Sequence, residues 1–275
     1  MPPFRHAVQM YTLRNVAGQD FAGACRRLAA MGFQGAELTD RRRQLSAANL
    51  KKLGQDCGLT WLSVHVPLEE MESDLYPIMD YYRQAGVMTL VCPWINEQRR
   101  KTFDDWQKIG TILEDISATL RKADMTLAYH HHDFEFLNIP IPDPDAAARV
   151  GNLFGQPGGA VTCGMDIILR ATAPANVKIE LDTYWLYFVG LNPAEIIRGV
   201  ADQLALLHCK DMAMGEGREF APVGSGRLDW AQILAGARAA GVEWLIVEQD
   251  DCYGQDPFTC LAASISYLRR LNNMV

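Results

Sequence analysis

The sequence predicts an α/β protein that folds as one closed (β/α)8 barrel. Eight short apolar runs alternate along the chain with longer stretches of helical periodicity, and such alternation implies a parallel sheet. Eight βα units allow the sheet to close, and 275 residues suit one TIM barrel of about 250 residues. Hydrophobic residues make up 49% of the chain, which is enough for a large core.

The predicted strands are short and mostly apolar, as expected of strands covered on both faces. An open, doubly wound sheet is the alternative, but no G-x-G-x-x-G motif follows the first apolar run. The predicted strands are His6–Met10, Gly35–Leu38, Thr60–Val64, Thr89–Cys92, Leu127–His130, Val177–Leu181, Ala205–Cys209 and Leu245–Val247.

Helical periodicity separates these strands, with apolar residues recurring at spacings of three and four. Ser46 and Asp229 suit N-caps, and Pro193 and Pro257 suit first-turn positions. The predicted helices are Phe21–Met31, Ser46–Asp56, Glu69–Gln84, Phe103–Ala123, Pro193–Ala201, Asp229–Ala240 and Pro257–Leu271. Glycines fall just before strands, where helices commonly end on a left-handed residue: Gly32, Gly58, Gly86 and Gly241.

The fifth βα unit is irregular. Its residues 139–164 contain "IPIPDPD" and "GQPGG", which predict an excursion over one end of the barrel. No break in composition indicates a second domain, so residues 1–275 are predicted to form a single one.

Composition narrows the functional classes. A net charge of −7 argues against a nucleic-acid groove or an anionic membrane as partner. The local exception is the run Arg41–Arg43, which suits a solvated loop or a phosphate or partner contact.

Seven cysteines without a C-x-x-C pair indicate reduced thiols. With no apolar leader or membrane-length apolar run, a cytoplasmic protein is expected, and homo-oligomers are ordinary for such barrels.

Polar or aromatic residues end six of the apolar runs. In a parallel barrel, chemistry gathers at the carboxyl ends of the strands. Any one of these residues could be an ordinary hydrogen-bonding or packing residue, but their joint appearance at one end indicates a site. Asp, His and Glu on three successive strands supply part of a mixed nitrogen–oxygen site for a divalent metal. The six residues are His65, Trp94, His130, Asp182, His208 and Glu248.

The triple histidine of "LAYHHHDFEF" can supply the remaining ligand. Because side chains alternate across a strand, His130 and His132 share one face and His131 points to the other. His132 is then predicted to lie with Asp133 and Glu135 on the following loop, near substrate. The alternative is a polar loop that binds no metal.

With His130, the predicted metal ligands become two imidazoles and two carboxylates. Such a set suits one Mn, Zn, Co or Fe ion better than Mg, which prefers oxygen ligands. The predicted ligands are His130, Asp182, His208 and Glu248.

Several motifs together resemble the xylose isomerase-like TIM barrel superfamily, in particular its sugar phosphate isomerase/epimerase group. They are "QMYTLR", "GFQGAEL", "SVHVP", "YHHHDFEF", "IELDTYW", "LLHCKDM", "PVGSGRLDW" and "IVEQD", and they cover nearly the whole chain in order. The resemblance implies a metal held by Glu, Asp, His and Glu, of which Asp182, His208 and Glu248 match three. His130 stands where many members have Glu, and Ser225 stands where similar sequences often carry an acidic residue.

The resemblance implies a metal-dependent sugar isomerase or epimerase that removes a proton next to a metal-bound carbonyl of a keto sugar or related polyol. Glu248 is the expected ligand and base, Lys210 the expected proton donor, and His130 completes the predicted catalytic set. Glu180 is expected to orient a ligand, or else to act as a base. The predicted substrate contacts are Glu37, His65, Trp94, His132, Trp185 and Lys210.

Two other functions remain open. With one matching glutamate, the same enolate chemistry can expel a leaving group, as in the inosose dehydratases and 3-keto-glycoside-cleaving enzymes that similar sequences resemble. A non-catalytic barrel that binds a sugar or a metal is the third reading. Exchange of solvent deuterium into recovered substrate indicates an isomerase, whereas release of water or an aglycone indicates a lyase.

Overall fold

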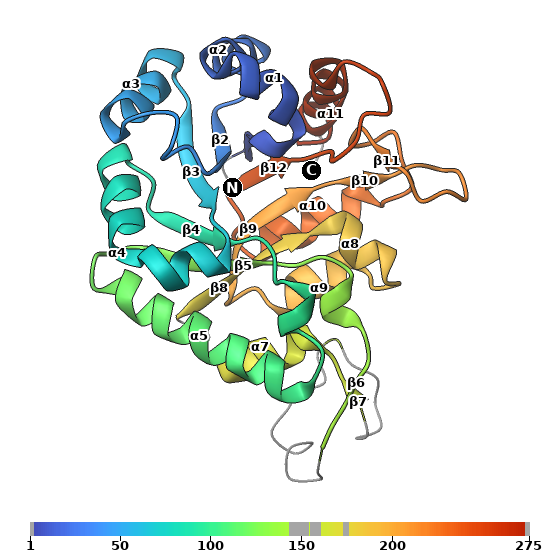
Figure 1. Ribbon diagram of the computed structural model, residues 1–275. Helices are drawn as coiled ribbons and strands as arrows, with labels where there is room; N and C mark the ends of the chain where they lie inside the picture. Colours follow the sequence, from blue (N-terminus) through green and yellow to red (C-terminus); the bar gives the residue numbers. More distant parts are fainter. Residues whose placement is uncertain (1–2, 143–153, 155–160, 173–175, 273–275) are drawn as a thin grey trace.

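Eight parallel strands close into a barrel in the order β1-β12-β9-β8-β5-β4-β3-β2, and helices surround this ring (Figure 1). The computed structural model describes residues 3–142, 154, 161–172 and 176–272. The predicted (β/α)8 barrel is therefore confirmed, and the open doubly wound sheet is wrong. The barrel strands are β1 (Arg5–Gln9), β2 (Gly35–Thr39), β3 (Thr60–His65), β4 (Thr89–Cys92), β5 (Thr126–His130), β8 (Val177–Asp182), β9 (Leu204–Cys209) and β12 (Trp244–Val247).

Each predicted helix is present, with ends within a few residues of those expected. Ser46 and Asp229 cap their helices by accepting hydrogen bonds from the backbone N–H of Asn49 and Gln232. Gly241 has a positive φ but follows the last helical turn, which ends at Ala240. Three of the predicted glycine caps are left-handed C-caps: Gly32, Gly58 and Gly86. These helices are α2 (Phe21–Met31), α3 (Ala47–Cys57), α4 (Leu68–Ala85), α5 (Phe103–Arg121), α9 (Pro193–Gly199), α10 (Trp230–Ala239) and α11 (Pro257–Asn272).

The structure adds elements that the sequence does not predict. The additional helices are α1 (Arg14–Gln19), α7 (Gly164–Ala171) and α8 (Thr183–Phe188), and the additional single turns are η1 (Met10–Leu13), η2 (Glu97–Arg99) and η3 (Phe134–Phe136). The sequence of α8, TYWLYF, favours strand by propensity, but Asp182 caps its first turn and so stabilises the helix.

Two short antiparallel ladders lie outside the barrel. Strand β6 (Ile139–Pro140) pairs with β7 (Val161–Thr162), which joins the two ends of the predicted excursion 139–164. Most of that excursion lies outside the described residues. Strand β10 (Asp211–Met212) pairs with β11 (Phe220–Ala221) after the seventh barrel strand.

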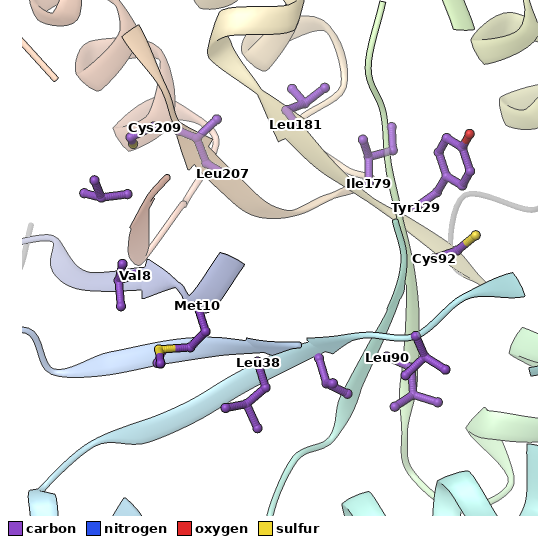
Figure 2. Close-up of a cluster of buried hydrophobic side chains, with 14 of the residues drawn as sticks. Val8, Met10, Leu38, Leu90, Cys92, Tyr129, Ile179, Leu181, Leu207 and Cys209 are labelled. Carbon is purple, nitrogen blue, oxygen red and sulfur yellow. The ribbon is translucent and has the colours of Figure 1, made fainter. Parts of the chain in front are cut away.

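Successive side chains of a strand point to opposite faces of the sheet, so the barrel strands contribute to two separate hydrophobic clusters. The smaller cluster fills the barrel interior with Ala7, Val91, Ala128, Leu206 and Ile246. The larger cluster packs between the barrel and the helices; Figure 2 shows members from β1, β2, β4, β5, β8 and β9, together with Met10 of η1. Side chains an even number of positions further along the same strands also face the interior. Polar residues at such positions near the carboxyl ends therefore point into the mouth of the barrel.

All seven cysteines are free thiols. Among the described helices, none is both long enough and apolar enough to cross a membrane.

Close packing of α7 on α5 depends on Gly110. A Cβ at this position would lie 2.3 Å from the Cβ of Ala171. We expect Gly110→Ala to lower the free energy of unfolding by about 1–3 kcal/mol, because the two helices must move apart. Chemical denaturation measures the effect. Gly18→Ala in α1 is the control: its new Cβ would meet nothing within 4 Å, so it should be neutral or stabilising. Equal losses in both variants would contradict the packing argument.

A buried histidine far from the barrel mouth should reduce stability in acid. Burial, together with Arg269, lowers the pKa of His6 from 6.5 to about 4. The unfolded chain therefore binds more protons at this residue, and stability is lost as the pH falls from 6.5 towards 4. In His6→Leu this loss is absent, so stability relative to the wild type should rise by up to about 3 kcal/mol between pH 7 and pH 4. Urea denaturation at both pH values tests this; a pH-independent difference would contradict it.

Candidate metal centre and active site

Four side chains from four strand ends meet at the mouth of the barrel. In His130, Asp182, His208 and Glu248, one nitrogen or oxygen atom of each lies within 4.8 Å of the corresponding atoms of the other three. All four residues are buried, with exposed fractions between 0 and 6%. The structure thus brings together the four predicted ligands, and the group could hold a metal ion.

Asp182 is the last residue of β8, and its two carboxylate oxygens have different surroundings. Its Oδ1 accepts hydrogen bonds from the backbone N–H of Tyr184 (2.8 Å) and Trp185 (3.1 Å). Its Oδ2 is buried and has no hydrogen-bond partner among the described residues. Burial raises the pKa of Asp182 to about 6. One oxygen therefore fixes the carboxylate while the other stays available to a cation.

His208 connects the mouth of the barrel to a deeper polar layer. Its Nδ1 lies 3.0 Å from Glu248 Oε2, and its Nε2 lies 2.6 Å from Glu37 Oε1 and 3.2 Å from Glu180 Oε2. Burial alone would lower the pKa of His208, but these three carboxylates outweigh it and raise the pKa well above its usual value. A metal bound to this imidazole would therefore displace a proton.

Glu180 contacts three imidazoles in the deeper layer. Its Oε2 lies 2.9 Å from His65 Nε2 and 3.1 Å from His130 Nδ1, in addition to His208. Together, His65, His130, Glu180 and His208 form a second group that could hold a metal. In this group His130 Nδ1 and Glu180 Oε1 are buried without a hydrogen-bond partner in the described part of the chain. Glu180 therefore contacts His130 and His208, two of the predicted ligands, directly, and it could itself be a ligand in the second group.

Glu37 and His65 close the floor of this layer. Glu37 is fully enclosed, and it accepts hydrogen bonds from Gln9 Nε2 (2.6 Å) and Ser63 Oγ (2.5 Å) besides contacting His208. Burial lowers the pKa of His65, but Glu37 and Glu180 reverse the effect and raise it to about 10. In contrast, burial and the neighbouring imidazoles keep the pKa of His130 well below its usual value, so His130 is neutral and suited to bind a metal.

Lys210 is the third cation of the centre. Its Nζ donates to Asp250 Oδ2 (2.8 Å) and lies 3.2 Å from Glu248 Oε2 and 3.4 Å from Asp182 Oδ2. Lys210 is 1% exposed; burial alone would lower its pKa, but these carboxylates raise it well above its usual value. Asp211, the next residue in the chain, instead accepts hydrogen bonds from backbone amides and from Trp230 Nε1 (2.8 Å).

The triple histidine follows the predicted alternation. His131 turns away from the mouth, and its Nε2 accepts a hydrogen bond from the backbone N–H of Asp182 (3.1 Å). His132 turns towards the mouth, with its ring 5.0 Å from that of Trp94. Glu135 lies on the following loop as predicted, but it does not line the described cavity: it is buried and accepts hydrogen bonds from Tyr129 Oη (2.6 Å) and the backbone N–H of His132 (2.8 Å). Asp133 does not line the described cavity either.

A cavity of about 520 Å³ opens above this centre. Six of the predicted site residues line it: His65, Trp94, His130, His132, Lys210 and Glu248. Of the remaining predicted substrate contacts, Glu37 lies in the deeper layer and Trp185 lies beside His132 and Lys210; neither is among the described lining residues.

Sequence reasoning misses seven further lining residues: Tyr11, Thr39, Asp40, Pro67, Glu70, Pro93 and Asp250. Asp250 stands two positions after Glu248, and Asp40 directly follows β2, so strand-end position is the signal that finds both.

A separate cavity of about 550 Å³ contains none of the predicted site residues. Two arginines line it, but both are bonded to backbone carbonyls: Arg218 to Phe188 (3.3 Å) and Arg227 to Ala213 (2.9 Å).

Known proteins resemble this chain over most of its length. Inosose dehydratase of Lacticaseibacillus casei is 22% identical over 248 residues, which cover 78% of this chain and 76% of that protein. A sugar phosphate isomerase/epimerase of Parabacteroides distasonis superposes with a TM-score of 0.81 at 20% identity, covering 97% of this chain and 98% of that one. D-psicose 3-epimerase of Clostridium cellulolyticum H10, solved with D-tagatose, gives 0.70 at 14% identity, covering 98% and 99%.

A family model agrees with these likenesses and with the resemblance inferred from the motifs. The model described as xylose isomerase-like TIM barrel matches residues 25–271, which is most of the chain. The chain belongs to the xylose isomerase-like TIM barrel family.

Proposed function

We propose that this protein is a metal-dependent enzyme that removes a proton from the carbon next to the carbonyl of a keto sugar or related polyol, and that it acts as an isomerase or epimerase. The observation that carries the proposal is the meeting of His130, Asp182, His208 and Glu248 within 4.8 Å of one another below an open cavity. The names of the solved structures that resemble the chain, sugar phosphate isomerase/epimerase and D-psicose 3-epimerase, agree with it.

The donor set fits a divalent ion. It offers two imidazoles and two carboxylates, a combination that favours Mn, Zn, Co or Fe over Mg. The Oδ2 of Asp182 supports the fit, because it is buried and accepts no hydrogen bond from the described residues, and its nearest cation, Lys210 Nζ, lies 3.4 Å away. When bound, such an ion acts as a Lewis acid towards a substrate carbonyl and stabilises the negative charge that develops during proton removal.

Glu248 is the proposed base. It lines the cavity, whereas Asp182 is committed to capping α8. Lys210 and His208 hold the pKa of Glu248 well below its usual range despite burial, so its carboxylate is ionised at neutral pH, which is the form that a base requires. The proton then returns to the same or the neighbouring carbon. Lys210, whose ammonium also borders the cavity, is the proposed donor to the substrate oxygen.

The substrate contacts are proposed from the walls of the cavity. Trp94 is 48% exposed there and offers an aromatic face to the apolar side of a sugar ring. His65 and His132 offer ring nitrogens to hydroxyl groups. Glu37 and Trp185 are proposed to act indirectly, Glu37 through His208 and Trp185 through its packing beside Lys210 and His132.

A dehydratase or other lyase is the second candidate. Epimerisation with two carboxylates on opposite substrate faces needs a second glutamate, and His130 stands where many relatives have it. Of the four proposed ligands, Glu248 is the carboxylate that borders the described cavity. One base suits enolate formation followed by loss of a β-oxygen substituent, which Lys210 would protonate as the C–O bond breaks. The curated relatives named inosose dehydratase point the same way.

A screen of keto sugars and cyclitol ketones in deuterated buffer, with protein loaded with Mn²⁺, tests both candidates. An isomerase or epimerase should incorporate deuterium into recovered substrate without loss of mass. A lyase should release water or an aglycone and build the absorbance of an enone. A non-catalytic barrel would do neither, and this outcome would contradict the proposed function.

A further inference from the structure

The charges around the cavity bear on the class of substrate. Four carboxylates line it: Asp40, Glu70, Glu248 and Asp250. The ammonium of Lys210 is the sole Lys or Arg charge among the described lining residues, and it already contacts Asp182, Glu248 and Asp250. His65, whose pKa is raised to about 10, is a second positive group of the lining, and it contacts Glu37 and Glu180. Four carboxylates against two cations leave an excess of negative charge for an anionic group on a substrate to meet.

The basic run 41–43 does not change this balance. Arg42 donates to both oxygens of Asp40 (2.9–3.2 Å), pairs with Glu70, and has a side chain that is 16% exposed. Arg41 is buried, with its guanidinium 4.6 Å from the ring centre of Phe21 and a hydrogen bond to Gln44 (2.5 Å). Arg41 and Arg42 are therefore enclosed or paired. Arg43 is exposed but lies 3.9 Å from Glu70 and does not line the described cavity.

Helix N-termini, the other common binding sites for phosphate, carry carboxylates of the chain itself near this cavity. Helix α4 begins directly after Pro67, which lines the cavity, and its first turn carries Glu69 and Glu70. Helix α8 begins at the mouth of the barrel, and Asp182 takes its first free amides. The positive ends of both helices thus already face carboxylates.

The same walls suit hydroxyl groups. Carboxylates accept strong charge-assisted hydrogen bonds from them. Trp94 is held edge-on by Phe134 (ring centres 4.7 Å apart), and its ring remains half-exposed at the rim; Tyr11, 43% exposed, is a second aromatic wall. Fixed aromatic faces beside hydrogen-bond acceptors are the chemistry that recognises an uncharged sugar or cyclitol.

We propose that the substrate is an uncharged polyhydroxy ketone that carries neither a phosphate nor a carboxylate group. The inference rests on the proposed function for the ketone, but the absence of charge follows from the cavity itself. The proposed substrate therefore differs from the sugar phosphate in the names of the solved isomerase/epimerases that share the fold.

Matched pairs of ketoses test the proposal. D-fructose and D-fructose 6-phosphate, and D-ribulose and D-ribulose 5-phosphate, are compared by calorimetry and by exchange in deuterated buffer with the Mn²⁺-loaded protein. Each parent ketose is expected to bind at least tenfold more tightly than its ester. Tighter binding of the esters would overturn the inference and leave the proposed function standing. Tighter binding of the parents with no exchange or elimination would uphold the inference and count against the proposed function.

A variant tests the electrostatic argument on the same pairs of ketoses. Glu70→Gln removes one carboxylate partner of Arg42, so the discrimination against the ester should shrink about fivefold or more. Glu72→Gln is the matched control: Glu72 lies on the same helix but pairs with Arg99 and does not line the described cavity. Unchanged discrimination in Glu70→Gln, or an equal change in Glu72→Gln, would overturn the electrostatic argument.

Discussion

Asp182→Asn is expected to abolish binding of a divalent ion, about one per wild-type chain, and to lower kcat/KM on the substrate found by the screen at least about a hundredfold. Asparagine keeps a side-chain oxygen that can cap α8, so the change removes charge from the centre while leaving the helix N-terminus satisfied. Metal analysis after dialysis against Mn²⁺ measures the first effect, and steady-state kinetics measures the second.

The matched control for that variant is Asp251→Asn. Asp251 follows Asp250 in the chain but is exposed, and its carboxylate accepts a hydrogen bond from the backbone N–H of Tyr253 (2.7 Å). It should retain the ion and the activity. His208→Ala should lose both, as Asp182→Asn does. Full metal content in Asp182→Asn and His208→Ala would place the ion elsewhere and remove the basis of the proposed chemistry.

Lys210→Met is expected to destabilise the metal-free protein by roughly 3–5 kcal/mol, because it leaves three carboxylates without their buried cation. The ammonium lies between 2.8 and 3.4 Å from Asp182, Glu248 and Asp250. In the metal-loaded protein the loss should be smaller, since a divalent ion restores positive charge beside Asp182 and Glu248. Urea denaturation in the presence of EDTA and of Mn²⁺ gives the two values.

Lys178→Met supplies the comparison for Lys210→Met. Lys178 lies on the same strand as Asp182, but its ammonium makes an exposed hydrogen bond to the backbone carbonyl of Asp202 (2.9 Å). Its removal should change stability by less than about 0.5 kcal/mol. A loss in Lys210→Met that is equally large with and without Mn²⁺ would mean that the ion and the ammonium do not share the carboxylates.

The sequence by itself determined the barrel and the main members of its centre. Alternating apolar runs and helical stretches predict eight parallel strands, and residues such as His130 and Asp182 were found because they close those strands. In a parallel barrel all carboxyl ends reach the same rim, so side chains far apart in the chain must converge there. Alternation within the strand also separated His130 from His131 without any structural information.

Tertiary structure alone decided which of these groups touch. The register of β8 against β9 shifts between Ile179 and Glu180, which brings Asp182 level with His208. Neither that shift nor the similar one at Glu37 in β2 can be recognised from the local sequence. Both shifts occur next to carboxylates, Glu180 and Glu37, that contact imidazoles in the deeper layer of the centre. Contacts across a closed barrel depend on the stagger of strands far apart in sequence, and this is why Lys210 pairs with Asp250 while Asp211 binds backbone amides.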